Sequence, residues 1–261
     1  MPISMVFQCI DCAQSIQIPR IALTGGEPTL REDINDIIRY IQDNTNCRLT
    51  LTTNGLHLDK IETAQPIDSI NLSVFSFKSG IEMEYQNVDP EYAILQLKKI
   101  SALEKSLNVL ITRRNWDELD TFVDVSQKNS FHLNIMFEKT FDEDYLAKQK
   151  ELLDNLINSY DSMILLQTTP TLHVNIGVDS SIKVKHPIIS SLVHSTICDG
   201  CNEYQDCFEK VCAIRVHPDG IVTPCLSRHL FYSQGTIEEN IREAYSVSMT
   251  RTLFRHSSIG S

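Results

Sequence analysis

The sequence predicts an α/β fold built around a parallel sheet or barrel. Its 261 residues, of which 42% are hydrophobic and 22% charged, have an ordinary globular composition and suffice for one large domain or a domain with an appendage. Over the first two-thirds of the chain, short β-rich apolar runs alternate with stretches of helical periodicity. This alternation implies right-handed crossovers between parallel strands, whose C-terminal ends bind ligands.

Five short runs are expected to form the strands. They are rich in Val, Ile, Leu, Thr and Phe, the residues that fit a pleated, half-buried surface. The runs are RIALT at 20–24, RLTLTT at 48–53, SINLSVF at 69–75, LNVLIT at 107–112 and FHLNIMF at 131–137.

Three helices are expected among these strands. Residues 3–16 place five apolar side chains on one helical face. The segment 89–100 begins with Asp89 as an N-cap and a proline at the first helical position. In the segment 115–125, Asn115 is followed three residues later by Glu118, which is close to a capping box.

The pattern changes near residue 160. The segments 169–178 and 213–226 are extended, and the second contains a Pro-Asp-Gly turn typical of a hairpin. A polar helix is expected over 236–248. We therefore divide the chain into residues 1–160, the barrel-like part, and residues 161–261, the C-terminal region.

Charge and hydropathy exclude several classes of partner. The formal net charge is −11 with a pI near 5.1, which argues against nucleic acid and anionic membranes but allows a local basic site for an anionic small molecule. No run approaches 18 apolar residues, and the N-terminus lacks a secretory leader. We expect a cytoplasmic protein.

The stretch LTGGEP, residues 23–28, follows the first predicted strand. Gly25 and Gly26 let the backbone approach a ligand, Glu27 offers a carboxylate and Pro28 fixes the turn. This combination suits an ammonium group, and the alternative is a tight turn with an exposed acid. The next two strands end in TTNG at 52–55 and in NLSV at 71–74, so polar residues follow three successive strands. They indicate the rim of a ligand site, although Ser73 alone fits a satisfied strand hydroxyl equally well.

The late cysteines predict a metal centre. Five of the eight cysteines fall within 28 residues, in the order C-x2-C-x5-C, then Cys212 and finally a Gly-x4-Cys ending. Thiolates from a short loop and a hairpin surround one centre in zinc ribbons and in iron–sulfur sites, and the spacing fits both. The proposed ligands are Cys198, Cys201, Cys207 and Cys225, with Cys212 as a possible replacement for one of them.

The segments IPRIALTGGEPTLREDINDII at 18–38, LTLTTNG at 49–55 and INLSVF at 70–75 resemble the radical S-adenosylmethionine superfamily, whose fold is a partial (β/α)6 TIM-like barrel. They are most similar to its branch of GTP 3′,8-cyclases, which act in molybdenum cofactor biosynthesis, and RRNWDEL at 113–119 is similar to a later segment of that branch. The resemblance implies S-adenosylmethionine as cofactor. It places the methionine amino group at Gly25, Gly26 and Glu27, with Pro28 closing the turn, and the carboxylate or ribose near Thr53, Asn54 and Ser73.

The same resemblance implies an auxiliary [4Fe–4S] cluster in the C-terminal region. In the cyclases three cysteines in the pattern C-x2-C-x13-C hold it, and its open iron holds a purine substrate. Here the second spacing is ten residues longer and contains two further cysteines. The ending Cys207-x12-Gly220-x4-Cys225 is similar to the SPASM-like auxiliary domains of peptide-modifying radical enzymes. Arg215 matches a substrate-side arginine of the cyclases, or is a surface strand arginine.

Two further features are compared with the family. The tail SSIGS at 257–261 is similar to the Gly-Gly tail of the cyclases, or is a frayed terminus. The C-x3-C-x2-C motif that holds the radical-generating [4Fe–4S] cluster does not occur in the sequence. Cys9 and Cys12 are spaced C-x2-C within the first predicted helix, where partly buried thiols are expected instead.

We therefore expect a barrel that lacks its first strand and radical cluster and leaves the strand at 20–24 with an exposed edge. Truncation of a complete enzyme is favoured over a degenerate relative or a strand supplied by a second chain.

The leading functional interpretation is a cyclase-like radical S-adenosylmethionine protein that acts on a GTP-like small molecule and takes electrons from an external donor. As a truncated chain that lacks the radical-cluster motif, it is expected to be inactive. One alternative is a peptide-modifying enzyme with a SPASM-like cluster. Another is a non-catalytic iron–sulfur or zinc-binding relative.

Overall fold

The computed structural model describes most of the chain. The described residues are 1–62, 64–78, 80, 88–140, 142–160, 162–165, 171–176, 179–185, 193–195, 198–199, 201–202, 213–225, 231–248 and 251–253. They form two compact units. The larger unit comprises Gln17–Met163 and His173–Val184, and the smaller comprises Met1–Ile16, Ile164–Leu172 and Lys185–Ser261.

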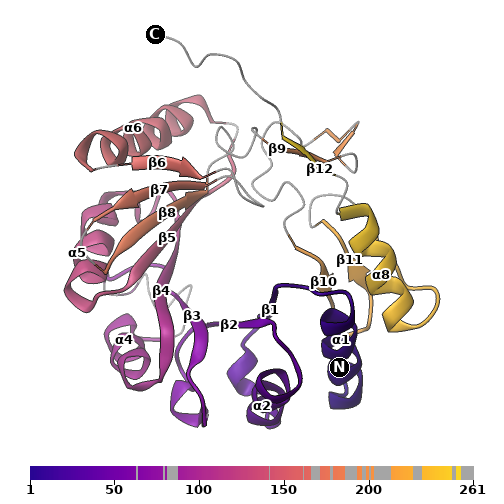
Figure 1. The fold of residues 1–261 in the computed structure, drawn as a ribbon. Helices are drawn as coiled ribbons and strands as arrows, with labels where there is room; N and C mark the ends of the chain where they lie inside the picture. Colours follow the sequence, from indigo (N-terminus) through magenta and orange to yellow (C-terminus); the bar gives the residue numbers. More distant parts are fainter. Residues whose placement is uncertain are drawn as a thin grey trace. The chain divides into compact units, whose positions relative to one another are not determined.

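An eight-stranded sheet is the centre of the larger unit, in the order β1-β2-β3-β4-β5-β8-β7-β6 (Figure 1). The first five strands are parallel to their neighbours, and each overlaps one of the five predicted runs. They are β1 (Arg20–Leu23), β2 (Arg48–Thr53), β3 (Ile67–Ser73), β4 (Ala102–Ile111) and β5 (His132–Phe137). The remaining strands are β6 (Ser162–Leu165), β7 (Thr171–Asn175) and β8 (Ser181–Lys185). The predicted α/β class with a mostly parallel sheet is confirmed.

Two details of the sheet can be compared with the predictions made from the sequence. Among the described strands of the sheet, β1 stands at one end of the order. β4 begins five residues earlier than the predicted run, because its polar start is held by neighbours. Glu104 accepts a hydrogen bond from Arg48 at 3.0 Å, and Lys105 donates to the carbonyl of Lys98 at 3.0 Å.

The helices that follow these strands along the chain lie on one face of the sheet, here called the outer face (Figure 1). They are α2 (Ile34–Asn44), α4 (Pro90–Lys99), α5 (Leu119–Asn129) and α6 (Glu143–Ser159). Alternate strand residues point toward them and are fully buried, as the period of two requires. These core residues include Leu51, Ile70, Leu72, Leu107, Val109, Leu133 and Ile135.

Two helix N-caps were predicted from the sequence, and the structure confirms the one at Asp89 but not the one at Asn115. The Asp89 carboxylate accepts a hydrogen bond from the Glu91 amide at 2.9 Å and caps α4 as expected. The capping box at Asn115 and Glu118 is wrong: a 3-10 turn, η3 (Trp116–Glu118), precedes α5, and neither side chain caps it. Both side chains instead bind the backbone of neighbouring loops, whose buried polar groups need partners.

The smaller unit combines both ends of the sequence. Its elements are α1 (Ile3–Ser15), β9 (Val193–Ser195), β10 (Arg215–Val216), β11 (Val222–Thr223), α8 (Ile237–Ser248) and β12 (Arg251–Leu253). The predicted hairpin is present as the antiparallel pair of β10 and β11, with Gly220 at a φ of +86° in its turn. Cys12 of α1 shares a small core with Val222, Ile241 and Ala244. The division at residue 160 stays a prediction.

Among the described residues, no helix is both long and apolar enough to cross a membrane.

Candidate functional site

The turn after β1 is organised by the carboxylate of Glu27. Its Oε1 accepts hydrogen bonds from the Thr29 amide at 3.0 Å, the Thr29 hydroxyl at 2.7 Å and the Thr53 hydroxyl at 2.7 Å. Its Oε2 accepts from the Asn54 amide at 2.6 Å. Glu27 thus caps the short helix η1 (Pro28–Leu30) and joins the C-terminal ends of β1 and β2. Because a carboxylate has about four lone-pair sites, Oε2 retains room for one further donor.

The two glycines before Glu27 leave the backbone bare. Gly25 has a φ of +132°, a conformation that residues with a side chain rarely adopt. A Cβ atom placed on Gly25 or on Gly26 would meet no atom of the described residues within 4 Å. The space beside this backbone is therefore open, and the glycines are not required by close packing within the larger unit.

Thr53 and Asn54 act locally rather than facing an open space. The Thr53 hydroxyl donates to Glu27 and accepts from the Gly55 amide at 3.0 Å, and the Asn54 side chain accepts from the Leu56 amide at 2.9 Å. Gly55, whose role the sequence did not reveal, has a φ of +86°. A Cβ atom there would lie 2.7 Å from Leu72 and 2.7 Å from Ala93, so α4 approaches too closely for a side chain.

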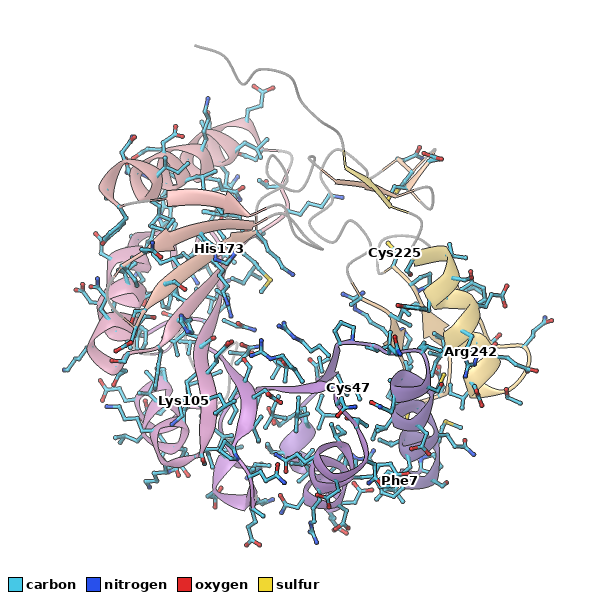
Figure 2. The ribbon with its side chains drawn as sticks, viewed as in Figure 1. Phe7, Cys47, Lys105, His173, Cys225 and Arg242 are labelled. Atoms are coloured by element: carbon cyan, nitrogen blue, oxygen red, sulfur yellow. The ribbon has the colours of Figure 1, made fainter. Side chains whose placement is uncertain are left out.

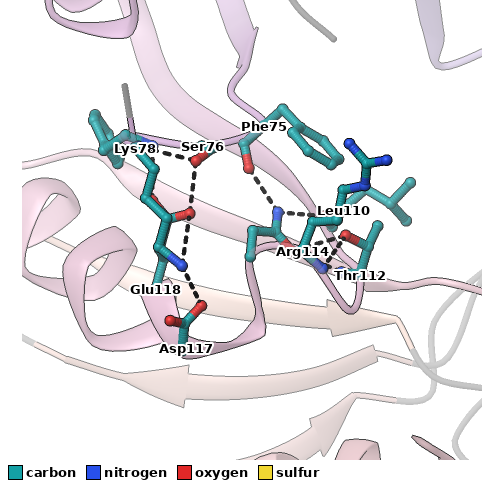
Figure 3. A network of polar contacts seen from close by, with 10 residues as sticks. Phe75, Ser76, Lys78, Leu110, Thr112, Arg114, Asp117 and Glu118 are labelled. Atoms are coloured by element: carbon teal, nitrogen blue, oxygen red, sulfur yellow. Dashed lines mark hydrogen bonds and ion pairs between the residues drawn. The ribbon is translucent and has the colours of Figure 1, made fainter. Parts of the chain in front are cut away.

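Ser73 is the last residue of β3, and the loop after it is tied to the loop after β4 (Figure 3). The buried carboxylate of Glu118 accepts from the Ser76 hydroxyl at 2.6 Å and from the Phe77 amide at 2.7 Å. The fully buried Asn115 donates from Nδ2 to the carbonyls of Phe75 at 2.6 Å and Leu110 at 2.9 Å. The sequence pattern contained both residues, but only the fold shows that they join two strand ends.

The face of the sheet opposite the helices, here called the inner face, is polar, and side chains project from it (Figure 2). The register aligns Thr50, Ser69 and Glu104 in one row across β2 to β4, and Thr52, Asn71, Ser106 and His132 in the next row across β2 to β5. A third row contains Ser73, Asn108 and Asn134. Barrel interiors are normally filled by branched aliphatic side chains, so this composition indicates a surface that receives a polar ligand.

Cations gather on the inner face of this acidic protein. Arg20 and Arg48 are partners in the β1–β2 register, and both are exposed. Like charges directly opposite each other destabilise a sheet. The ion pair of Arg48 with Glu104 at 3.0 Å offsets part of this repulsion. Burial acts to raise the pKa of Glu104, but the hydrogen bond from Arg48 and the nearby positive charges bring this pKa below its usual range.

Two histidines flank Lys183 of β8. His132 lies on β5, with its Nδ1 3.0 Å from the Ser181 hydroxyl, and His173 lies on β7 (Figure 2). Burial lowers the pKa of both imidazoles, and the charge of Lys183 lowers each further, while Glu104 partly opposes the shift at His132. Both rings therefore favour the neutral form in the folded protein.

A cavity of about 500 Å³ lies at the other end of the strands from LTGGEP. It is lined by the first residues of β4, β5 and β8, among them Glu104, His132 and Ser181. Its position at the N-terminal ends of these strands separates it from Gly25 and Glu27, which follow the C-terminal end of β1.

Part of the late cysteine cluster is assembled within the smaller unit. Cys225, which is 7% exposed, packs against Cys198, and the Cys201 amide donates to the Cys198 carbonyl at 3.1 Å in a tight turn. Arg215 lies on β10, opposite Thr223 at the end of the hairpin that leads to Cys225. Among the described residues, no three metal-ligating side chains meet at one point. Cys207, Cys212 and the tail at 257–261 lie outside the described residues.

Cys9 and Cys12 lie on α1 as expected and are not poised as metal ligands. Cys12 is buried, and its Sγ lies 3.8 Å from the carbonyl of Glu238. Burial, with the neighbouring Cys12, raises the pKa of Cys9 to about 11, and burial also raises the pKa of Cys12. Because a metal binds the thiolate, both groups are poorly suited to ligation at neutral pH.

Comparison with known proteins identifies relatives. Residues 4–125 match the model of the Radical SAM superfamily. The GTP 3′,8-cyclase of Lactiplantibacillus plantarum is 26% identical over 247 residues, which cover 85% of this chain and 68% of that protein. A probable GTP 3′,8-cyclase of Saccharolobus islandicus (strain Y.N.15.51) is 26% identical over 261 residues, covering 88% of this chain and 77% of that protein.

Solved structures share the fold. SuiB of Streptococcus suis superposes with a TM-score of 0.63 at 15% identity, covering 94% of this chain and 59% of SuiB. The structure of native anSMEcpe with bound AdoMet gives a TM-score of 0.54 at 17% identity, covering 95% of this chain and 72% of that one. Residues 4–125 are therefore similar to the radical SAM superfamily, and the chain is similar to curated GTP 3′,8-cyclases over most of its length.

Proposed function

We propose that the chain binds S-adenosylmethionine beside LTGGEP and a GTP-like small molecule on the inner face, as a cyclase-like radical SAM protein of molybdenum cofactor biosynthesis. The observation that carries this proposal is the open backbone of Gly25 and Gly26 next to the fixed carboxylate of Glu27. In this position Glu27 Oε2 accepts the ammonium group of the methionine moiety. Such a charge-assisted hydrogen bond is stronger than a neutral one.

The neighbouring residues hold this carboxylate in place. The Thr53 hydroxyl and the Asn54 amide fix its two oxygens, and Pro28 is buried at the start of η1. Thr53 and Asn54 thus act through Glu27, whereas Ser73 at the end of β3 is proposed to bind the cofactor's carboxylate or ribose.

The cations of the inner face support an anionic substrate. Arg20, Arg48 and Lys183 provide positive charge within a protein whose net charge is −11, and the guanidinium fork is well suited to phosphate. The two cyclase relatives are named for GTP, which carries a triphosphate. A GTP-like nucleotide is therefore the substrate class that we propose.

The smaller unit is proposed to hold a [4Fe–4S] cluster at Cys198, Cys201, Cys207 and Cys225, with Arg215 on the substrate side. The contact between Cys198 and the buried Cys225 supports this site, since soft thiolates are the usual ligands of such clusters. When bound, the cluster provides one-electron chemistry, and electrons would come from an external donor in a reducing cytoplasm. The 261 residues contain no C-x3-C-x2-C motif, so they provide no comparable ligand set for a radical-generating cluster.

Titration calorimetry with S-adenosylmethionine tests the cofactor site. We expect Glu27→Gln to weaken binding about tenfold or more, because a charge-assisted hydrogen bond contributes about 1.5–3 kcal/mol. The control is Glu32→Gln, on an exposed carboxylate five residues away in the sequence. Equal affinities of the parent and Glu27→Gln, or no binding by the folded parent, contradict the proposed site.

A peptide substrate is the second candidate. SuiB, which shares the fold, has been solved bound to the precursor peptide SuiA, and the Gly-x4-Cys ending is present in the hairpin region here. Binding of S-adenosylmethionine without any binding of GTP would favour this candidate, or a non-catalytic relative, over the cyclase-like function.

A further inference from the structure

The cavity at the N-terminal ends of the strands is lined by residues of the larger unit. It has a volume of about 500 Å³ and is formed by the start of β4, the α5–β5 connection and the β7–β8 connection. All of its lining residues fall within Gln17–Met163 or His173–Val184. None of the residues that the proposed function names for the cofactor or the substrate is among them. The cavity is therefore a separate feature of the fold.

A buried hydroxyl in the β7–β8 connection lines this cavity without an internal partner. Ser180 is 7% exposed, and its carbonyl accepts a hydrogen bond from the Ile176 amide at 3.3 Å, which fixes the backbone of the turn. Within the described residues, the Ser180 hydroxyl makes no hydrogen bond. Buried polar side chains in native proteins nearly always have a hydrogen-bond partner. A hydroxyl of this kind beside a cavity therefore points to an occupant of that cavity that forms hydrogen bonds.

The cavity also presents acceptors that the described part of the chain leaves unused. Asp179 has neither a hydrogen bond nor an ion pair there. Glu104 accepts from Arg48 through Oε1 at 3.0 Å, so Oε2 stays available. The Nδ1 atom of His132 lies 3.0 Å from the Ser181 hydroxyl, and in the tautomer whose Nδ1–H donates to that hydroxyl, Nε2 is an acceptor. The cavity is thus rich in acceptors.

The charges around these acceptors favour a cation. Burial lowers the pKa of His132, so its ring favours the neutral form and adds no positive charge. Lys105 is the cation among the lining residues, but it is the register partner of Ile70 on the outer side of β4, and its Nζ donates to the Lys98 carbonyl of α4 at 3.0 Å. Its charge is therefore held away from the inner side, where the cavity presents carboxylates that accept hydrogen bonds only.

The size of the cavity and its set of ligands favour an organic cation over a metal ion. Among the described residues, no three His, Cys, Asp or Glu side chains are placed to hold a metal together. A volume of about 500 Å³ is that of a small-molecule site, and it is far larger than one ion needs. An ammonium group provides three N–H donors and a positive charge, which match the unused acceptors.

We propose that this cavity binds a small molecule that carries a primary ammonium group. Asp179 is the charge partner of the ammonium, and the Ser180 hydroxyl and Glu104 Oε2 are its further acceptors. The site lies at the opposite end of the strands from the Gly25–Glu27 turn, and the proposal does not depend on the proposed function.

An NMR titration of the full chain with three ligands of equal chain length tests this site. Butylamine, butan-1-ol and butyrate differ in the charge of one terminal group, which is positive, neutral or negative at neutral pH. Dissociation constants come from the chemical-shift changes of the backbone amides. We expect butylamine to bind about fivefold or more tightly than butan-1-ol, because one charge-assisted hydrogen bond is gained, and butyrate to bind most weakly. The largest shifts should fall on the β7–β8 connection.

Three variants complete the experiment. Asp179→Asn keeps the shape of the side chain and removes its charge, so it should weaken butylamine binding about five- to tenfold and abolish the preference over butan-1-ol. Ser180→Ala removes only a hydroxyl and should weaken butylamine binding about two- to fivefold, which keeps the test valid if the first variant fails to fold. Asp124→Asn, on an exposed carboxylate of α5 that does not line the cavity, should leave all three constants unchanged.

The outcomes distinguish this site from the cofactor site. Equal affinities for butylamine and butan-1-ol overturn the proposal, as does butylamine binding that neither cavity variant weakens. Displacement of butylamine by magnesium chloride would mean a metal site and overturn it as well. Asp179→Asn should bind S-adenosylmethionine as the parent does, and a loss of that binding would contradict a separate site. A parent that binds butylamine in the cavity but does not bind S-adenosylmethionine overturns the proposed function alone.

Discussion

On the outer side of β3, Ile70 and Leu72 are fully buried, and α4 packs over this strand, whereas Asn71 and Ser73 on the inner side of the same strand are half-buried and polar. The outer face is closed by aliphatic packing, which is the main favourable term in folding. The inner face forgoes that packing across β2 to β5. One side of the sheet therefore provides packing stability, and the opposite, polar side is the one on which we propose that ligands bind.

Substitution on each side of β3 tests this division most strongly. Leu72→Ala should lower the free energy of unfolding by about 2–5 kcal/mol, because it removes a fully buried side chain and leaves a cavity. Asn71→Ala, one residue away, should change it by less than about 1.5 kcal/mol, since one long hydrogen bond is lost. Urea denaturation measures both, and equal losses would remove the distinction between the faces.

Glu118 joins the strand ends at the C-terminal edge, where the two faces meet. Glu118→Ala should cost about 2 kcal/mol of unfolding free energy, because the Ser76 hydroxyl and the Phe77 amide lose a buried acceptor. Glu118→Gln, which keeps a carbonyl oxygen, should recover part of this loss.

Asp117→Ala provides the matched control for Glu118. Asp117 binds Lys78 at 2.6 Å, but its side chain is 58% exposed, so the change should stay within about 1 kcal/mol. Thermal and urea denaturation of the three variants rank these effects. An Asp117 variant as unstable as Glu118→Ala would contradict the role of burial.

The smallest expected effect is a pH dependence from the inner face. The folded-state pKa values of His132 and His173 lie below their unfolded value near 6.5, first because of burial and then because of Lys183. Below pH 6.5 the unfolded chain therefore binds more protons than the folded one, and stability falls as the pH decreases. Unfolding midpoints between pH 7.5 and 5.5 measure the slope.

A double variant tests whether the two histidines cause this pH dependence of stability. Replacing His132 and His173 by Asn should flatten the dependence between pH 7.5 and 5.5, because the two groups that resist protonation are removed. An unchanged slope would mean that other groups are responsible and that the inner face does not exclude the added charge.

Much of the fold and part of the site follow from local patterns. The five strand runs, the Asp89 cap, the Pro-Asp-Gly hairpin and the LTGGEP turn each depend on residues close in sequence, so periodicity and turn chemistry predict them. The wrong capping box at Asn115 and Glu118 shows the limit. The same side chains bind loops about forty residues away, and satisfying those buried groups overrides the local preference.

The sequence by itself determined which segments form strands and helices and which turn exposes bare backbone, because those properties depend on neighbours along the chain. Only the tertiary structure decided that α1 shares a core with the C-terminal hairpin, and that Glu27 joins β1 to β2. It also decided that three asparagines from β3, β4 and β5 meet. These contacts depend on strand order and register, which residues distant in sequence set together through packing.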